Sequence, residues 1–87
     1  MLYLAEFYLP DSGSSLAELA SRARAGAERA AATSAPDSDV RFVRAIHVPS
    51  DESCFVLYTA TSAAAVNAAG ACADITFDRV VEAAATS

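Results

Sequence analysis

The 87-residue sequence predicts a single α+β domain, residues 1–87, with elements in the order strand, helix, strand, strand, helix, strand. The first observation behind this fold is the stretch VRFVRAIHVPSDESCFVLYTA at residues 40–60, where two apolar runs flank a short polar turn. The second is its surroundings: a strand-like run and an Ala-rich helical stripe precede it, and a helical stripe and a strand-like run follow. An apolar period of 2 residues indicates the strands, and an apolar period of 3.6 residues indicates the helices.

The N-terminal part predicts one strand and one helix. The strand is expected at Leu2–Leu9, and both of its alternating faces are largely apolar. Ser15 is the expected N-cap of the helix, because Glu18 three residues later completes a capping box. The helix should run to about Thr33, and Gly26 inside it suggests a close backbone contact, since Gly costs about 1 kcal/mol relative to Ala in a helix.

The central hairpin is expected to pair Val40–Val48 with Ser53–Ala60 through a turn at Pro49–Glu52. Strict alternation divides the first of these strands into Val40, Phe42, Arg44, Ile46 and Val48 on one face and Arg41, Val43, Ala45 and His47 on the other. The second strand is apolar on both faces, which places it at the centre of the sheet.

The C-terminal part predicts a second helix at about Ser62–Ala69, ended by Gly70 in the left-handed conformation, and a last strand at Phe77–Ala83. Right-handed crossovers then place both helices on one face of a four-stranded antiparallel sheet. This is the ferredoxin-like βαββαβ arrangement. The other face would be bare, although the strands are apolar on both sides. We therefore expect a homodimer that packs sheet against sheet or forms a dimeric α/β barrel.

Composition excludes some partners. The net charge is −5 and the six basic residues are all Arg and scattered, so no nucleic-acid surface is expected. No apolar run reaches the roughly 18–20 residues that span a bilayer, and the N-terminus lacks the basic region of a signal peptide. The expected location is the cytoplasm, where Cys54 and Cys72 should be free thiols.

Four side chains near the hairpin turn are candidate metal ligands: His47, Asp51, Glu52 and Cys54. A metal site needs at least three donors, and only the hairpin geometry decides whether these four converge. The structural alternatives are a strand His hydrogen-bonded near a turn and an inert buried Cys.

Glu6 and Tyr58 are candidates for lining a cleft. A carboxylate among apolar strand residues is costly to bury alone, so Glu6 is expected to serve such a cleft, to pair with Arg79 or Arg44, or simply to be exposed. Aromatic residues on apolar strands more often belong to the core, which is the alternative for Tyr58.

The pattern of the hairpin and last strand resembles a family of small bacterial proteins of largely unknown function, one branch of which is nickel-binding. The resemblance covers nearly the whole chain and rests on Val40–Val43, Arg44, Pro49, Asp51, Glu52, Cys54, Ala60, Ala65, Val66, Asp78, Arg79 and Val80. It implies a ferredoxin-like homodimer that binds nickel or another divalent ion.

Three functions are consistent with these features. The favoured one is a small homodimeric binding protein, for a divalent metal or another small ligand, without catalysis. The second is a cofactor-independent dimeric α/β-barrel enzyme, an oxygenase or isomerase of small aromatic or polyketide-like substrates, with Glu6 and His47 as acid and base in one cleft. The third is a protein-interaction module whose bare sheet face docks a different protein.

Overall fold

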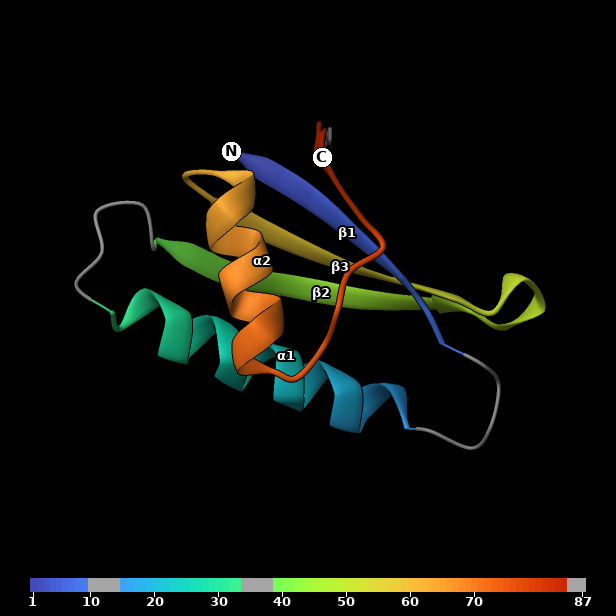
Figure 1. The fold of residues 1–87 in the computed structure, drawn as a ribbon. Helices are drawn as coiled ribbons and strands as arrows, with labels where there is room; N and C mark the ends of the chain where they lie inside the picture. The colour runs from blue at the N-terminus through green and yellow to red at the C-terminus, as the bar shows by residue number, and fades with distance from the viewer. Residues whose placement is uncertain (10–14, 34–38, 85–87) are drawn as a thin grey trace.

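The computed structural model describes residues 1–9, 15–33 and 39–84 of the chain. The elements run β1 (Leu2–Tyr8), α1 (Leu16–Ala31), β2 (Val40–Val48), a 3₁₀ turn η1 (Pro49–Asp51), β3 (Ser53–Ala60), α2 (Ala63–Cys72) and β4 (Arg79–Ala83) (Figure 1). The strands form one antiparallel sheet in the order β2-β3-β1-β4. The predicted ferredoxin-like βαββαβ fold is confirmed.

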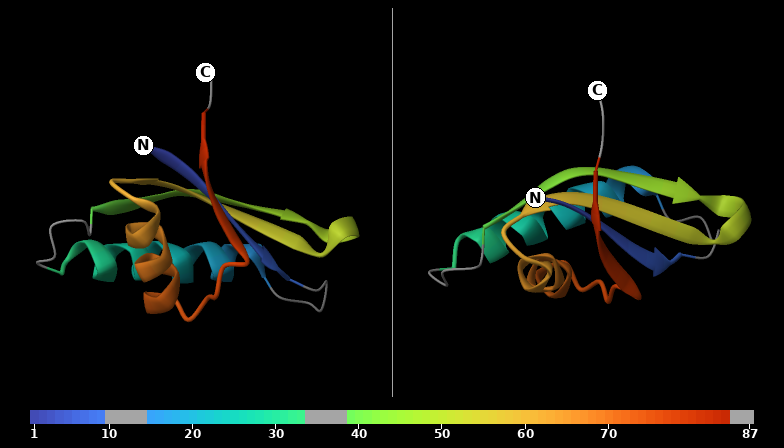
Figure 2. Two further views of the ribbon diagram at one scale, coloured as in Figure 1. Left: turned by 45° about the horizontal axis from the view of Figure 1, so that its top comes forward. Right: turned by 90° about the horizontal axis from the view of Figure 1, so that it is seen from above.

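Both helices lie against the same face of the sheet (Figure 2). The covered face contributes every second residue of β1 and β3 to the core, and the helices contribute mostly alanine. The buried side chains of the two central strands are Tyr3, Ala5, Phe7, Cys54, Val56, Tyr58 and Ala60. Because alanine buries little area, the larger strand side chains fill most of the space between the layers. No helix in the described part of the chain is long and apolar enough to cross a membrane.

A bulge in β2 changes which side chains share a face. The pairing with β3 shifts between Phe42 and Arg44, so that Phe42 lies opposite Tyr58 and Arg44 opposite Leu57. Phe42 therefore faces the helices, whereas Arg44 and Ile46 lie on the uncovered face. The strict alternation predicted for this strand is wrong, because a bulge inserts one extra residue and reverses the parity after it.

Each helix has a serine at its N-cap position. The Ser15 hydroxyl oxygen accepts a hydrogen bond of 3.3 Å from the backbone N–H of Glu18. The Ser62 hydroxyl oxygen accepts one of 3.2 Å from the backbone N–H of Ala65. Each bond satisfies one of the N–H groups that a helix start leaves without a helical partner.

Gly70 does not end the second helix as predicted. The helix α2 continues to Cys72, and the left-handed residue beyond it is Asp74, with φ of 60°. Gly70 is instead required for space, because a Cβ atom there would lie 2.5 Å from the Phe77 ring and 2.9 Å from the Ile75 carbonyl oxygen. Phe77 precedes β4 and packs its ring against Phe7 and Tyr58, so the last strand begins at Arg79 rather than at Phe77.

Two arginines of α1 hold the end of α2. Arg22 Nε donates a hydrogen bond of 3.0 Å to the Ala73 carbonyl oxygen, and the Arg29 guanidinium donates to the Cys72 carbonyl oxygen. These carbonyls are among the last of the helix and have no helical partner, and positive charge there complements the helix dipole. Arg24, the third of this group, lies with its guanidinium carbon 5.1 Å from the centre of the Phe42 ring.

Candidate functional site

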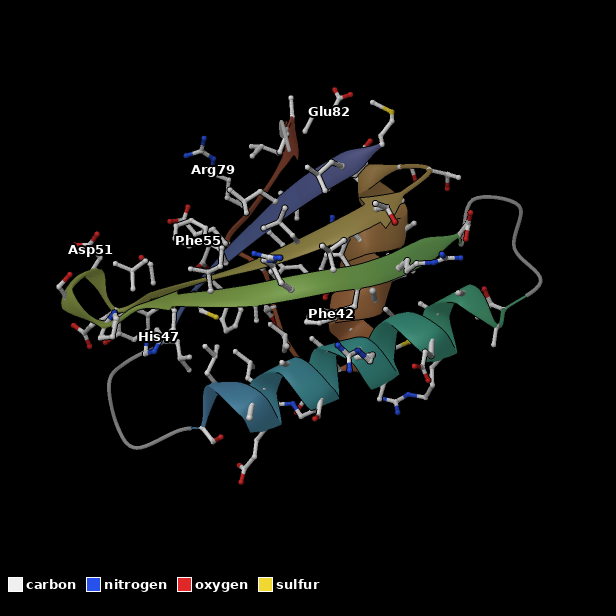
Figure 3. All side chains as sticks on the ribbon, turned by 180° about the vertical axis from the view of Figure 1, so that it is seen from behind. Phe42, His47, Asp51, Phe55, Arg79 and Glu82 are labelled. Carbon is white, nitrogen blue, oxygen red and sulfur yellow. The ribbon has the colours of Figure 1, made fainter. Side chains whose placement is uncertain are left out.

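The uncovered face of the sheet carries partly exposed apolar side chains in cross-strand rows. One row reads Arg44, Leu57, Leu4 and Val81, and the next reads Ile46, Phe55, Glu6 and Arg79. Figure 3 shows Phe55 and Arg79 on the side away from the helices and Phe42 on the side of α1. The apolar members of these rows are half-buried, apart from Ile46, which is 42% exposed. This surface, called the open face below, extends across all four strands.

A pocket of about 280 Å³ lies in the open face on β1, β3 and β4, and it is lined by Leu4, Glu6, Phe55, Arg79 and Val81. The Glu6 carboxyl is half-buried there, with Arg79 directly opposite on β4. Within the described residues, neither side chain makes a hydrogen bond or an ion pair. The expected pairing of Glu6 with Arg79 or Arg44 is thus not made inside one chain.

Tyr58 lies on the other face from Glu6, so the two do not share a cleft within one chain. Its side chain is fully buried under the helices, edge-on to the rings of Phe42 and Phe77. The hydroxyl group has no hydrogen-bond partner among the residues that the structure describes. Burial raises the pKa of Tyr58 to about 12, because the phenolate would be poorly solvated there.

His47 and Cys54 are direct cross-strand neighbours on the covered face. The His47 Nε2 atom lies 3.3 Å from the Leu9 carbonyl oxygen, and Cys54 is completely buried. Burial raises the pKa of the Cys54 thiol to about 11, so the thiol stays protonated at neutral pH. His47 and Glu6 lie on opposite faces of the sheet, which keeps them from acting as acid and base on one bound substrate in a single chain.

Asp51 and Glu52 are exposed in the turn, and the Glu52 side chain contacts Tyr8. Glu52 has a left-handed backbone, with φ of 52°, and its N–H donates to the Pro49 carbonyl oxygen. Its carboxylate accepts a hydrogen bond of 3.1 Å from the Tyr8 hydroxyl. This bond and the negative charge of Glu52 raise the pKa of Tyr8 above its ordinary value.

The four predicted ligands therefore do not form one donor set. Two of them, His47 and Cys54, are neighbours on the covered face, and the other two occupy the turn. Across residues 1–9, 15–33 and 39–84 the structure contains no group of three or more His, Cys, Asp or Glu side chains placed to hold a metal ion. A metal site with three protein donors needs at least one ligand beyond this pair.

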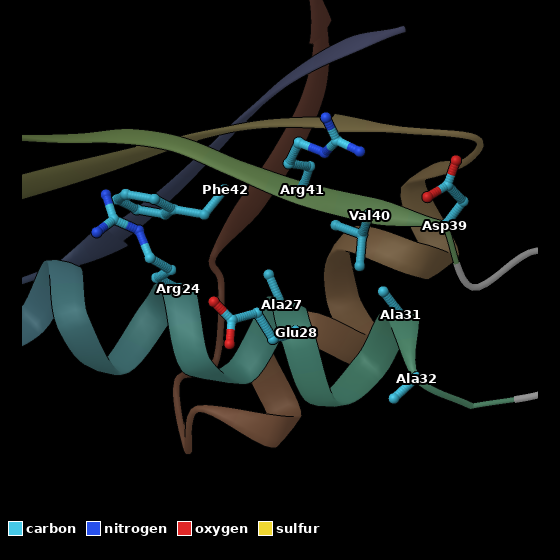
Figure 4. A pocket seen from close by; sticks show the side chains of 9 residues that line it. All are labelled: Arg24, Ala27, Glu28, Ala31, Ala32, Asp39, Val40, Arg41 and Phe42. Carbon is cyan, nitrogen blue, oxygen red and sulfur yellow. The ribbon is translucent and has the colours of Figure 1, made fainter.

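A groove of about 490 Å³ runs between α1 and the start of β2 (Figure 4). Its apolar floor consists of Ala27, Ala31 and Val40. At one end lie Arg24, stacked on Phe42, and Glu28. The sequence reasoning missed this groove, although small Ala residues facing a strand with a large aromatic are a signal for it. Figure 4 shows the Arg41 side chain directed away from the helix, so the groove has one inward-facing arginine at its Phe42 end.

Comparison of the chain with protein-family models, with curated proteins and with solved structures finds no significant match in any of the three.

Proposed function

We propose that the chain is a small homodimeric binding protein whose two subunits pack through the open faces of their sheets. The observation that supports this most directly is the composition of the open face. Its central positions hold Leu4, Phe55, Leu57 and Val81, each with part of its apolar surface in solvent. A contiguous apolar surface of this kind is unusual on a monomer and is typical of a protein interface.

Sedimentation equilibrium at micromolar concentration tests the dimer. We expect a mass twice the 9.0 kDa of the chain. Leu57→Glu places a charge at the centre of the open face and should give a monomer, because an unpaired charge is costly to bury. Ala64→Glu, on the exposed surface of α2, is the matched control and should stay dimeric. A monomeric wild-type protein would overturn the proposal and favour an interaction module that docks a different protein.

We propose nickel or another divalent metal ion as the ligand, as the family resemblance implies. The cross-strand pair of His47 and Cys54 supports it, since imidazole and thiolate both suit such metals. Calorimetric titration with nickel, copper and zinc is the test. Affinity tighter than millimolar that is lost in His47→Ala supports metal binding. Weaker binding, or binding unchanged by the substitution, would leave another small ligand as the partner.

The enzyme alternative has less support. It requires Glu6 and His47 to act as acid and base in one cleft, but these two residues lie on opposite faces of the sheet. Tyr58 and Glu6 are separated in the same way. These placements favour binding over acid–base catalysis by this pair.

A further inference from the structure

We propose that the two copies dock with the β2 side of one open face over the β1 and β4 side of the other, and that Glu6 pairs with Arg44 of the partner subunit. This inference rests on the proposed homodimer and specifies its geometry.

The first argument is the state of Glu6. Glu6 is a half-buried residue in a pocket that is also lined by Leu4, Phe55, Arg79 and Val81, and its carboxylate makes no hydrogen bond or ion pair within the described residues. An apolar surface laid over this pocket would strip the remaining water from an unpaired charge, which is strongly unfavourable. A covering surface that brings a cation to Glu6 avoids this cost.

The second argument is what β2 presents on the same face. Arg44 and Ile46 are exposed and lie two residues apart, opposite Leu57 and Phe55. Within the described residues the Arg44 guanidinium has no hydrogen bond or ion pair. The β2 side thus offers an apolar side chain next to an unpaired cation, which complements the apolar pocket and unpaired carboxylate of the β1 and β4 side.

Symmetry brings these two sides together. A two-fold axis that lies in the interface and runs along the strands reverses the strand order β2-β3-β1-β4, so β2 lies over β4 and β3 over β1 of the partner. In this alignment Ile46 covers the row that contains Glu6 and Arg79 of the partner subunit. Arg44 then lies beside Val81 of the partner subunit, within side-chain reach of the pocket. The contact is made twice because the interface is isologous.

The alternative axis, which lies in the interface but runs across the strands, is disfavoured by charge. It lays β2 over β2 in the opposite direction, and an axis that passes between Arg41 and Arg44 brings these arginines of one copy against the same arginines of the other. Both arginines are exposed on the open face, and opposed like charges weaken an interface.

Charge reversal with mixing tests the pairing, using sedimentation equilibrium on folded protein checked by circular dichroism. We expect Glu6→Arg and Arg44→Glu each to raise the dimer dissociation constant by roughly tenfold or more. An equimolar mixture of the two variants should recover the dimer, because both contacts of the heterodimer then join opposite charges, one as in the wild type and the other with the charges reversed. Glu28→Arg, the same charge change on the exposed side of α1, should keep the wild-type constant to within about twofold.

The outcomes separate the two proposals. A monomeric wild-type protein removes the homodimer itself. A wild-type dimer with charge-reversed variants that dimerise normally, or that do not recover on mixing, overturns only the Glu6–Arg44 pairing. Recovery when Glu6→Arg is mixed with Arg79→Glu, and not with Arg44→Glu, would also overturn it, since the partner cation would then be Arg79.

Discussion

Gly26 of α1 lies so close to Ala73 at the end of α2 that an added Cβ atom would be 2.7 Å from the Ala73 Cβ. The same Cβ would lie 2.8 Å from the Ala69 carbonyl oxygen, which belongs to the backbone and cannot rotate away. We expect Gly26→Ala to destabilise the protein. Overpacking costs about 1–3 kcal/mol, and this cost outweighs the roughly 1 kcal/mol that alanine gains over glycine in helix propensity. Urea denaturation measures the difference.

Ser21→Ala is the matched control for this substitution. Ser21 is exposed on the same helix, so its replacement should change the free energy of unfolding by less than about 0.5 kcal/mol or raise it slightly. A Gly26→Ala variant as stable as the Ser21→Ala variant would show that the two helices can separate without cost.

Gly70→Ala is expected to destabilise through its contact with Phe77. The new Cβ would lie 2.5 Å from the ring, and the ring also packs against Phe7 and Tyr58, so it cannot move freely. We expect a loss of about 1–3 kcal/mol. Combining Gly70→Ala with Phe77→Leu should cost less than the sum of the two single changes, because the smaller side chain leaves room for the Cβ. Strict additivity in a double-mutant cycle would contradict this contact.

Alkaline pH should destabilise the protein through Cys54 and Tyr58. Burial raises the pKa of Cys54 from 9.0 to about 11 and that of Tyr58 from 10.0 to about 12. Both groups ionise first in the unfolded chain, so their stabilising effect is complete below pH 9 and is lost as the pH rises toward 12. Each group should contribute a slope of about 1.4 kcal/mol per pH unit between its two pKa values.

Two variants separate these contributions. Cys54→Ala should remove the lower part of the alkaline decline, and Tyr58→Phe should remove the upper part. Tyr58→Phe should also keep or raise stability at neutral pH, by up to about 1 kcal/mol, because the hydroxyl group it removes has no hydrogen-bond partner among the described residues. An unchanged alkaline profile in both variants would show that other groups cause the decline.

Glu52→Gly should lower the pKa of Tyr8 toward its ordinary value. The substitution removes both the hydrogen-bond acceptor and the negative charge, and glycine readily adopts the φ of 52° at this position. Titration of the Tyr8 ring by NMR measures the change. Asp51→Asn is the control, since Asp51 shares the turn and is not the acceptor of the Tyr8 hydroxyl. Equal shifts in the two variants would show that the charge of the turn, rather than the hydrogen bond, sets the pKa.

The order of elements, the caps and the covered face of β1 and β3 could be predicted from the sequence because their signals are local. Ser15 and Glu18 mark the start of the first helix. In β1 the alternation of side chains predicts that Tyr3 and Phe7 lie on the opposite face of the sheet from Glu6. Gly70 was assigned the wrong role, because a glycine chosen for its backbone freedom and one chosen for lack of a Cβ look alike in sequence. Only the Phe77 ring, seven residues later, distinguishes them.

The candidate sites depended on information that the sequence does not contain. The bulge after Phe42 reverses the parity of β2, and nothing in VRFVRAIHV marks it. That reversal places Arg44 and Ile46 on the open face and His47 beside Cys54 on the covered one. The proximity of the predicted ligands in sequence was misleading because two of them, Asp51 and Glu52, lie in the exposed turn, whereas His47 and Cys54 lie on the covered face of the strands.

The bulge in β2 also affects how the protein behaves at high concentration. A flat, regular edge strand can recruit the edge of another molecule and extend a sheet without limit, which is the route to fibres. The edge strand β2 is interrupted between Phe42 and Arg44 and carries the exposed charge of Arg41. End-to-end growth along this edge is therefore disfavoured, whereas the proposed pairing of two open faces would be closed by its two-fold symmetry and would give a discrete particle rather than a polymer.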